Sequence, residues 1–213
     1  MNILRIDASI QGTSSAGSAL ADLVVTEATQ GRPDATVVRR HLAAEPLPST
    51  AWADAVSAGY VAAEQRTPAQ VEALALAGSL ADELRAADAA VLALPLYNYG
   101  VSQHVKIWMD LAIAGAPMGE RLLDGTPVVL VVTRGGGYGP GTPREGWDHN
   151  VDYVRRIVGD VWGAELTVVE RELTLVGVNP ALDELAELGA LARKTAEEAA
   201  IEAGAALGEH RAA

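Results

Sequence analysis

Short apolar runs alternate with longer segments of helical periodicity along this chain. Five runs have the length and composition of β-strands, at residues 3–8, 36–39, 89–94, 127–132 and 166–173. The third and fourth runs are almost purely apolar, which is typical of strands that are covered on both faces. The pattern therefore predicts a five-stranded sheet with its third and fourth strands at the centre.

Segments with apolar residues three and four positions apart separate these runs and predict helices. The expected helical segments are 14–30, 50–64, 67–87, 103–114, 147–162 and 180–207. Ser14 or Ser15 can cap the first of them. Thr67-Pro68-Ala69-Gln70 has the pattern of a capping box with proline at the first helical position.

Strands that are joined by helices predict a parallel sheet with helices on both faces. The number of elements fits a flavodoxin-like α/β fold with strand order 2-1-3-4-5. The length of 213 residues suits one domain over residues 1–213, and the 49% of hydrophobic residues supply a sizeable core.

Composition narrows the possible functions. The chain has no cysteine, which excludes disulfides, thiolate catalysis and cysteine-ligated metals. Its four histidines lack the spacing of metal ligands, so no metal is expected. A net charge of −12 disfavours a nucleic-acid partner. The N-terminus has no signal-peptide pattern and no apolar run is long enough to span a membrane, so we expect a cytoplasmic protein without a membrane partner.

Three loops that follow predicted strands hold most of the unusual residues. In an open parallel sheet, ligands bind outside the carboxyl ends of the strands. The first loop, residues 9–18, is rich in hydroxyl and small side chains and leads into a helix. Helix N-terminal amides favour an anion, so this loop is a candidate phosphate site, although a helix cap with a flexible loop also explains it.

The other two loops favour a flat ligand. Residues 95–102 place two tyrosines and an asparagine directly after the most apolar strand, where they can pack on a ring and meet its polar edge, or form a hydrophobic corner. Residues 133–142 contain five glycines, which allow close backbone approach and positive φ, or simply a mobile loop.

These loops resemble those of the FMN-dependent NADH-azoreductases and the related flavodoxin-like NAD(P)H quinone reductases. That family has a serine-rich loop, a Pro-Met-Tyr-Asn-Phe-type loop and a Ser-Arg-Gly-Gly-type loop after strands one, three and four. This chain has Ser9 and Ser15, then Pro95-Leu96-Tyr97-Asn98-Tyr99, then Thr133-Arg134-Gly135-Gly136. The similarity extends to residues 70–74 and 105–111 and covers nearly the whole chain.

The resemblance implies an FMN site. Ser9 and the Ser15-Ala16-Gly17 turn would hold the phosphate, Pro95 and residues 96–99 would line one side of the isoalloxazine, and residues 133–136 would close over it. Gly17 stands where the family has a hydroxyl residue, so Ser18 or Thr13 is expected to substitute. Leu96 replaces the common Met and Tyr99 the common Phe.

Three further aromatic residues are candidates for the substrate pocket. Tyr138 lies in the glycine run, Trp52 lies in the long connection after the second strand, and Trp162 is the nearest match to a helix aromatic that lines the family's pocket. Trp52 either caps the pocket or packs in the core.

The expected activity is transfer of two electrons from NADH or NADPH to a quinone or an azo-type aromatic acceptor. The flavin carries the chemistry, so no catalytic side chain is expected, and one pocket serves donor and acceptor in a ping-pong mechanism. The 103–114 helix is apolar nearly all round, which predicts a homodimer. A flavodoxin-type electron carrier and a pathway-specific reductase of an aromatic natural product are the alternatives.

Overall fold

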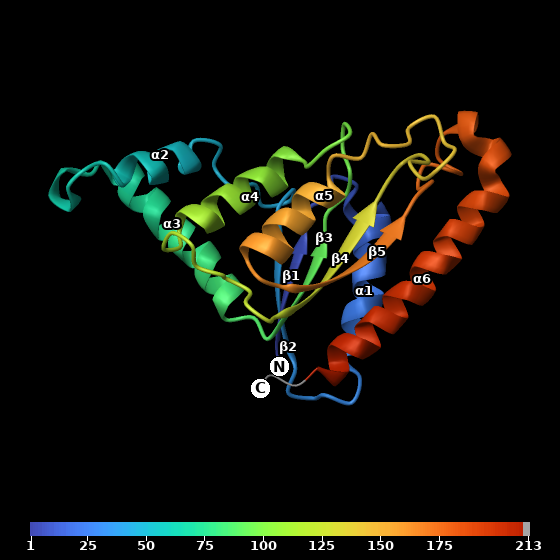
Figure 1. Cartoon of the computed structure of the whole chain (residues 1–213), viewed down its shortest axis with the longest axis horizontal. Helices are drawn as coiled ribbons and strands as arrows, with labels where there is room; N and C mark the ends of the chain where they lie inside the picture. Colours follow the sequence, from blue (N-terminus) through green and yellow to red (C-terminus); the bar gives the residue numbers. More distant parts are fainter. Residues whose placement is uncertain (211–213) are drawn as a thin grey trace.

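The computed structural model describes residues 1–210, so the last three residues of the expected single domain lie outside the described part. Its centre is a parallel sheet of order β2-β1-β3-β4-β5, as predicted (Figure 1). The strands are β1 (Asn2–Asp7), β2 (Thr36–His41), β3 (Ala89–Ala93), β4 (Pro127–Thr133) and β5 (Glu165–Arg171). Every residue of β3 is buried, which matches its purely apolar sequence.

Helices cover both faces of this sheet (Figure 1). They are α1 (Ala16–Thr29), α2 (Ala51–Ala58), α3 (Pro68–Arg85), α4 (Gln103–Ala114), α5 (Val151–Val154) and α6 (Ala186–Glu209). The helices α1 and α6 pack together on one face, while α3, α4 and α5 cover the other and α2 packs outside α3 and α4. Each face has its own hydrophobic core.

Side-chain caps fix where three of the helices begin. Ser15 accepts a hydrogen bond from the backbone of Ser18 at the start of α1, and Ser102 caps α4 in the same way. Thr67 and Gln70 form the complete capping box that the sequence predicts for α3. Such caps satisfy backbone N–H groups that have no partner within the helix.

The structure differs from the predicted helix boundaries in three places. The expected helix at 180–207 begins as a 3-10 segment over Pro180–Leu185, and α6 follows it from Ala186 to Glu209. The expected helix at 50–64 ends at Ala58, and a short 3-10 turn follows it. The expected helix at 147–162 begins only at Val151 and continues as a π-helix over Arg155–Val161. The Asp148 carboxylate accepts the N–H groups of Asn150 and Val151, so a side chain two residues before the N-cap Asn150 satisfies the first amides of α5.

The apolar surface of α4 is largely used within the chain. Val105, Trp108, Met109 and Leu111 are all buried between the sheet and the outer helices, and only Ile113 is substantially exposed. The two apolar faces of α4 are therefore explained by a helix that is packed on both sides, and they do not by themselves require a second subunit. Within residues 1–210, no helix is both long and apolar enough to cross a membrane.

Candidate functional site

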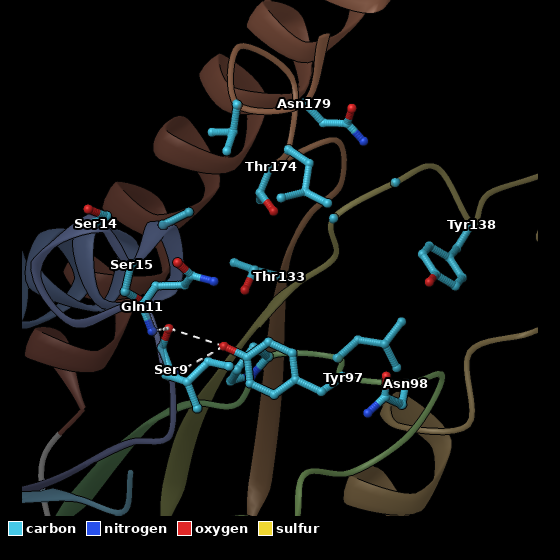
Figure 2. Close-up of a pocket in the computed structure, with 18 of the residues that line it drawn as sticks. Ser9, Gln11, Ser14, Ser15, Tyr97, Asn98, Thr133, Tyr138, Thr174 and Asn179 are labelled. Atoms are coloured by element: carbon cyan, nitrogen blue, oxygen red, sulfur yellow. Dashed lines mark hydrogen bonds between the residues drawn. The ribbon is translucent and has the colours of Figure 1, made fainter. Parts of the chain in front are cut away.

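A cavity of about 720 Å³ lies at the carboxyl ends of the strands. Its walls come from the four loops that follow β1, β3, β4 and β5. Figure 2 shows hydroxyl and amide side chains at the end next to α1 and Tyr138 on the far side, with Thr133 between them. The cavity thus joins the three loops that the sequence singled out, together with a fourth.

One end of the cavity is built from hydroxyl groups and a helix N-terminus. Ser9, Ser14, Ser15 and Gln11 line it, and α1 starts beside it at Ala16. Ser15 Oγ accepts a hydrogen bond from the N–H of Ser18. The amides that precede Ser18 in the first turn have no partner within the helix. No charged side chain lines this end. Neutral donors and a helix dipole form a site for one anionic group.

The residues expected at this end divide into those that line it and those that do not. Ser9, Ser15 and Ala16 line the cavity. Gly17 does not, and a Cβ at this position would lie 3.5 Å from Oγ1 of Thr133, an ordinary van der Waals distance, so packing there does not require glycine. Ser18 does not replace the hydroxyl that is missing at position 17, because its own hydroxyl donates to Asp7 Oδ1 at 2.7 Å. Ser14 and Gln11 line the cavity instead, whereas Thr13 does not, and no pattern in the sequence distinguishes them from Thr13.

A buried ion cluster fixes the start of α1 from below. Asp7 is fully buried at the end of β1 and accepts bonds of 2.8 Å from Nε of both Arg5 and Arg39. Burial acts to raise the pKa of Asp7, but the bonds from Arg5 and Ser18 outweigh it and hold the pKa below its ordinary value. Asp7 therefore stays ionised and anchors the first helical turn through Ser18.

The loop after β3 has strained backbone at the cavity wall. Asn98 and Tyr99 have φ values of 48° and 68°, in the left-handed region that side chains other than glycine rarely adopt. Both line the cavity, as do Pro95, Leu96 and Tyr97. The Tyr97 hydroxyl accepts the N–H of Ile10 at 3.1 Å and lies 3.3 Å from Ser9 Oγ, so Tyr97 joins this loop to the hydroxyl-rich end (Figure 2).

The glycines after β4 allow close packing rather than unusual backbone. Thr133, Gly135 and Gly136 line the cavity. Neither of these glycines has positive φ; between β4 and α5 the glycines that do are Gly141 and Gly146, at 78° and 77°. A Cβ on Gly135 would lie 2.8 Å from Leu175, and one on Gly136 would lie 2.6 Å from Nη1 of Arg144. The expectation that positive φ explains this run is wrong for the two glycines at the wall.

Arg134 does not line the cavity. Its buried guanidinium bonds Asp148 at 2.5 Å and Glu170 at 2.9 Å, with Glu172 at 3.5 Å. Burial acts to lower the pKa of Arg134, and its bonds to Glu170 and Asp148 outweigh that effect and raise it. The role of Arg134 is to fasten the glycine loop to β5 and to the segment before α5.

The three aromatic candidates for the substrate pocket lie in different places. Tyr138 lines the cavity. Trp52 instead lines a second cavity of about 490 Å³ between the 46–52 segment and α4. Trp162 is buried in the core, where it packs edge-on against Trp108 with ring centroids 5.5 Å apart. The placement of Trp162 in the pocket is wrong, because the π-helix ends with this indole turned into the core.

Sequence reasoning missed the loop after β5. Thr174, Leu175, Val178, Asn179 and Leu182 all line the cavity (Figure 2). The signal was available, because β5 is parallel to β4 and its loop leaves the same edge of the sheet. Thr174 also donates its hydroxyl to the carbonyl of Arg134, which ties this loop to the glycine loop.

The cavity lining offers no aspartate, glutamate, histidine or lysine as a general acid or base. Burial raises the pKa of Tyr138 above its ordinary value despite the opposing charge of Arg144, so its hydroxyl stays protonated at neutral pH. Within residues 1–210, no group of three potential metal ligands is assembled. The site can bind and place a ligand that brings its own chemistry.

Comparisons with known proteins match both the fold and nearly the whole length of the sequence. A family model for the flavodoxin-like fold matches residues 1–202. An FMN-dependent NADH:quinone oxidoreductase of Frankia alni is 38% identical over 93% of this chain and 96% of its own length. One of Streptomyces avermitilis is 37% identical over 92% of each chain. The fold also matches an FMN-dependent NADH-azoreductase of Bacillus anthracis in complex with FMN, with a TM-score of 0.71, 17% identity and coverage of 95% and 99% of the two chains.

Proposed function

This chain belongs to the family of flavodoxin-like FMN-dependent NADH:quinone oxidoreductases, and we propose that it binds FMN in the strand-end cavity and transfers two electrons from NADH to quinone or azo-type aromatic acceptors. The observation that carries the site assignment is one cavity with two chemically different ends. FMN has the matching halves, a terminal phosphate and a flat ring with a polar edge.

The hydroxyl-rich end fits the phosphate. Ser9, Ser14 and Ser15 supply hydroxyl donors, and the first amides of α1 supply N–H groups. Because no cation lies at this end, the helix dipole and neutral donors would balance the phosphate charge. Gln11 is the additional donor that this structure brings to the same end.

The opposite part of the cavity fits the ring. Leu96 is a buried apolar wall, while Asn98 and Tyr99 bring polar groups on strained backbone to the same side. Gly135 and Gly136 line the cavity on the side of the glycine loop, where Leu175 and Arg144 lie within 3 Å of the positions that their Cβ atoms would take. We propose that residues 95–99 and 133–136 hold the ring, with Arg134 acting only through the loop that it fastens.

FMN supplies the two-electron chemistry when it is bound. The chain contributes placement, since no aspartate, glutamate, histidine or lysine lines the cavity. The Tyr138 hydroxyl stays protonated and neutral, and Arg144 is the charged side chain of the lining. One cavity adjoins the proposed ring-binding residues 95–99 and 133–136, so we propose that NADH and the acceptor occupy it in turn.

Steady-state kinetics test this proposal. With FMN-saturated protein, double-reciprocal plots for NADH against a small quinone should give parallel lines, as expected for ping-pong exchange in one pocket. Intersecting lines would require a ternary complex and a separate acceptor site. Rates across a panel of quinones and azo compounds distinguish a broad reductase from a pathway-specific one. The absence of any turnover would favour the alternative of a flavodoxin-type electron carrier.

We also propose that the protein is a homodimer. Trp52, Val56 and Tyr60 are 46%, 39% and 88% exposed along one segment, and Trp52 lines the second cavity beside α4. Apolar side chains gathered next to a hollow are typical of an interface. A cytoplasmic location, where NADH is available, is part of the same proposal.

A further inference from the structure

Arg144 carries the charge of the main cavity. Among the described residues that line it, Arg144 is the one with a charged side chain. The chain as a whole has a net charge of −12, so its overall field repels anionic ligands. A cation in this position is therefore the local exception to the charge of the molecule.

The guanidinium of Arg144 has no ion-pair partners like those of Arg134, the other arginine between β4 and α5. Arg134 forms three ion pairs, whereas the Arg144 side chain forms no salt bridge and no hydrogen bond within residues 1–210. Its contact is with an aromatic ring, because Cζ lies 5.9 Å from the centroid of Tyr138. A cation over a ring is held loosely and keeps all its N–H donors available.

Arg144 lies at the open part of the cavity rather than at the phosphate end. Its Nη1 lies 2.6 Å from where a Cβ of Gly136 would be, so the guanidinium sits directly over the glycine proposed to face the ring. Arg144 is itself exposed, which places it at the mouth where the distal part of an entering ligand would lie.

We propose that Arg144 is a specificity-determining residue that binds an anionic group, a carboxylate, sulfonate or phosphate, on the ligand that enters above the ring. A guanidinium fork matches the oxygens of these groups with two parallel hydrogen bonds. The anion belongs either to a substituted aromatic acceptor or to the diphosphate of NADH. This inference rests on the proposed function, since it assumes that both ligands use this cavity.

The test compares a naphthoquinone sulfonate with unsubstituted naphthoquinone in FMN-saturated protein. Arg144→Gln should raise KM for the sulfonate about tenfold, the effect of losing a charge-assisted hydrogen bond. The kcat should stay unchanged, because such binding acts equally on ground and transition states. KM for the neutral quinone should not change, and Arg144→Lys should restore part of the binding.

Arg156→Gln is the control, because it removes one positive charge from a side chain that is 73% exposed, pairs with Asp160 and does not line the cavity. If KM for NADH rises in Arg144→Gln in place of KM for the sulfonate, the recognised anion is the donor's diphosphate. Equal behaviour of the two arginine variants toward both anionic ligands would overturn the proposal.

Calorimetric titration of the sulfonate into the same proteins separates this inference from the function itself. A tenfold weaker dissociation constant in Arg144→Gln supports anion binding whether or not turnover occurs. Wild-type protein that binds the sulfonate but does not reduce the neutral quinone would contradict the proposed activity alone.

Discussion

Gly135 and Gly136 show how single residues shape this site. Each would place a Cβ within 3 Å of a side chain from another part of the loop region, and neither needs glycine for its backbone angles. The neighbour of Gly136 is the far end of the flexible Arg144 side chain, which can move aside. A substitution at Gly136 therefore acts mainly on whatever occupies the cavity.

We expect Gly136→Val to weaken FMN binding about 5- to 150-fold, the equivalent of an overpacking cost of about 1–3 kcal/mol. The measurement is the FMN dissociation constant by fluorescence titration, with Tm recorded beside it. Gly78→Val in α3 is the control, because a side chain there meets nothing within 4 Å. Full FMN occupancy in Gly136→Val would mean that this loop does not touch the ring.

At the residue scale, the sequence predicts which loop positions reach the cavity better than it predicts where their side chains point. Ser9, Ser15 and residues 95–99 lie at the cavity as expected, because strand ends fix where loops emerge. The directions of Arg134 and Trp162 were not predictable, since each depends on partners distant in sequence, such as Glu170 for Arg134 and Trp108 for Trp162.

Helix α1 links the fold to the proposed phosphate site. Its cap, Ser15, is both a helix-starting residue and a cavity-lining hydroxyl. The Asp7 cluster below holds the same turn in place through Ser18. These two features predict separable effects on stability and on FMN binding.

Ser15→Ala should lower the free energy of unfolding by about 1 kcal/mol, the usual cost of a lost cap. It should also weaken FMN binding about tenfold or more, because a hydrogen bond to the charged phosphate is lost. Thr67→Ala removes the cap of α3, which is distant from the cavity lining, and should cost similar stability with unchanged FMN affinity. Chemical denaturation and FMN titration of both variants measure the difference; equal FMN affinity in the two would contradict a phosphate at α1.

Asp7→Asn should destabilise the fold by about 3–5 kcal/mol, because it leaves the buried Arg5 without its main partner. Asp22→Asn is the control, since Asp22 also pairs with Arg5 but is 64% exposed, and it should cost less than about 1 kcal/mol. Urea unfolding of the three proteins at neutral pH compares these costs. Similar losses in both variants would mean that burial does not set the value of the pair.

The stabilisation by Asp7 should also depend on pH. Its pKa is lowered in the folded state, so protonation favours unfolding, and its contribution is present above the unfolded pKa of about 3.9 and is lost as pH falls below that value. The unfolding free energies of wild type and Asp7→Asn should therefore converge in acid. A constant difference between them down to pH 2 would contradict an ionised Asp7.

At the element scale, the strands and most helices followed from apolar periodicity and caps. The exceptions have physical causes. The segment before α5 stays irregular because Asp148 is held by Arg134, and the π-helix after it has no signature in the sequence. The loop after β5 has no glycine run or aromatic cluster that marks it as part of a site, although the strand-end rule places it at the cavity.

For the whole molecule, we expect light scattering at micromolar concentration to give twice the chain mass of 22.1 kDa. Trp52→Glu should shift this mass to that of the monomer, because a charge would be buried at the proposed interface. Leu191→Glu on α6 is the control; its side chain is 61% exposed on the other side of the sheet, and the dimer should persist. A wild-type monomer would contradict the proposed assembly.

The visible spectrum of the purified protein tests the central claim most directly. After incubation with FMN and removal of the excess, we predict a yellow protein that releases about one FMN per chain on acid treatment. Anaerobic addition of NADH should bleach this absorbance, and a quinone should restore it. A colourless protein that retains no added FMN would contradict the assignment of the cavity and, with it, the proposed function.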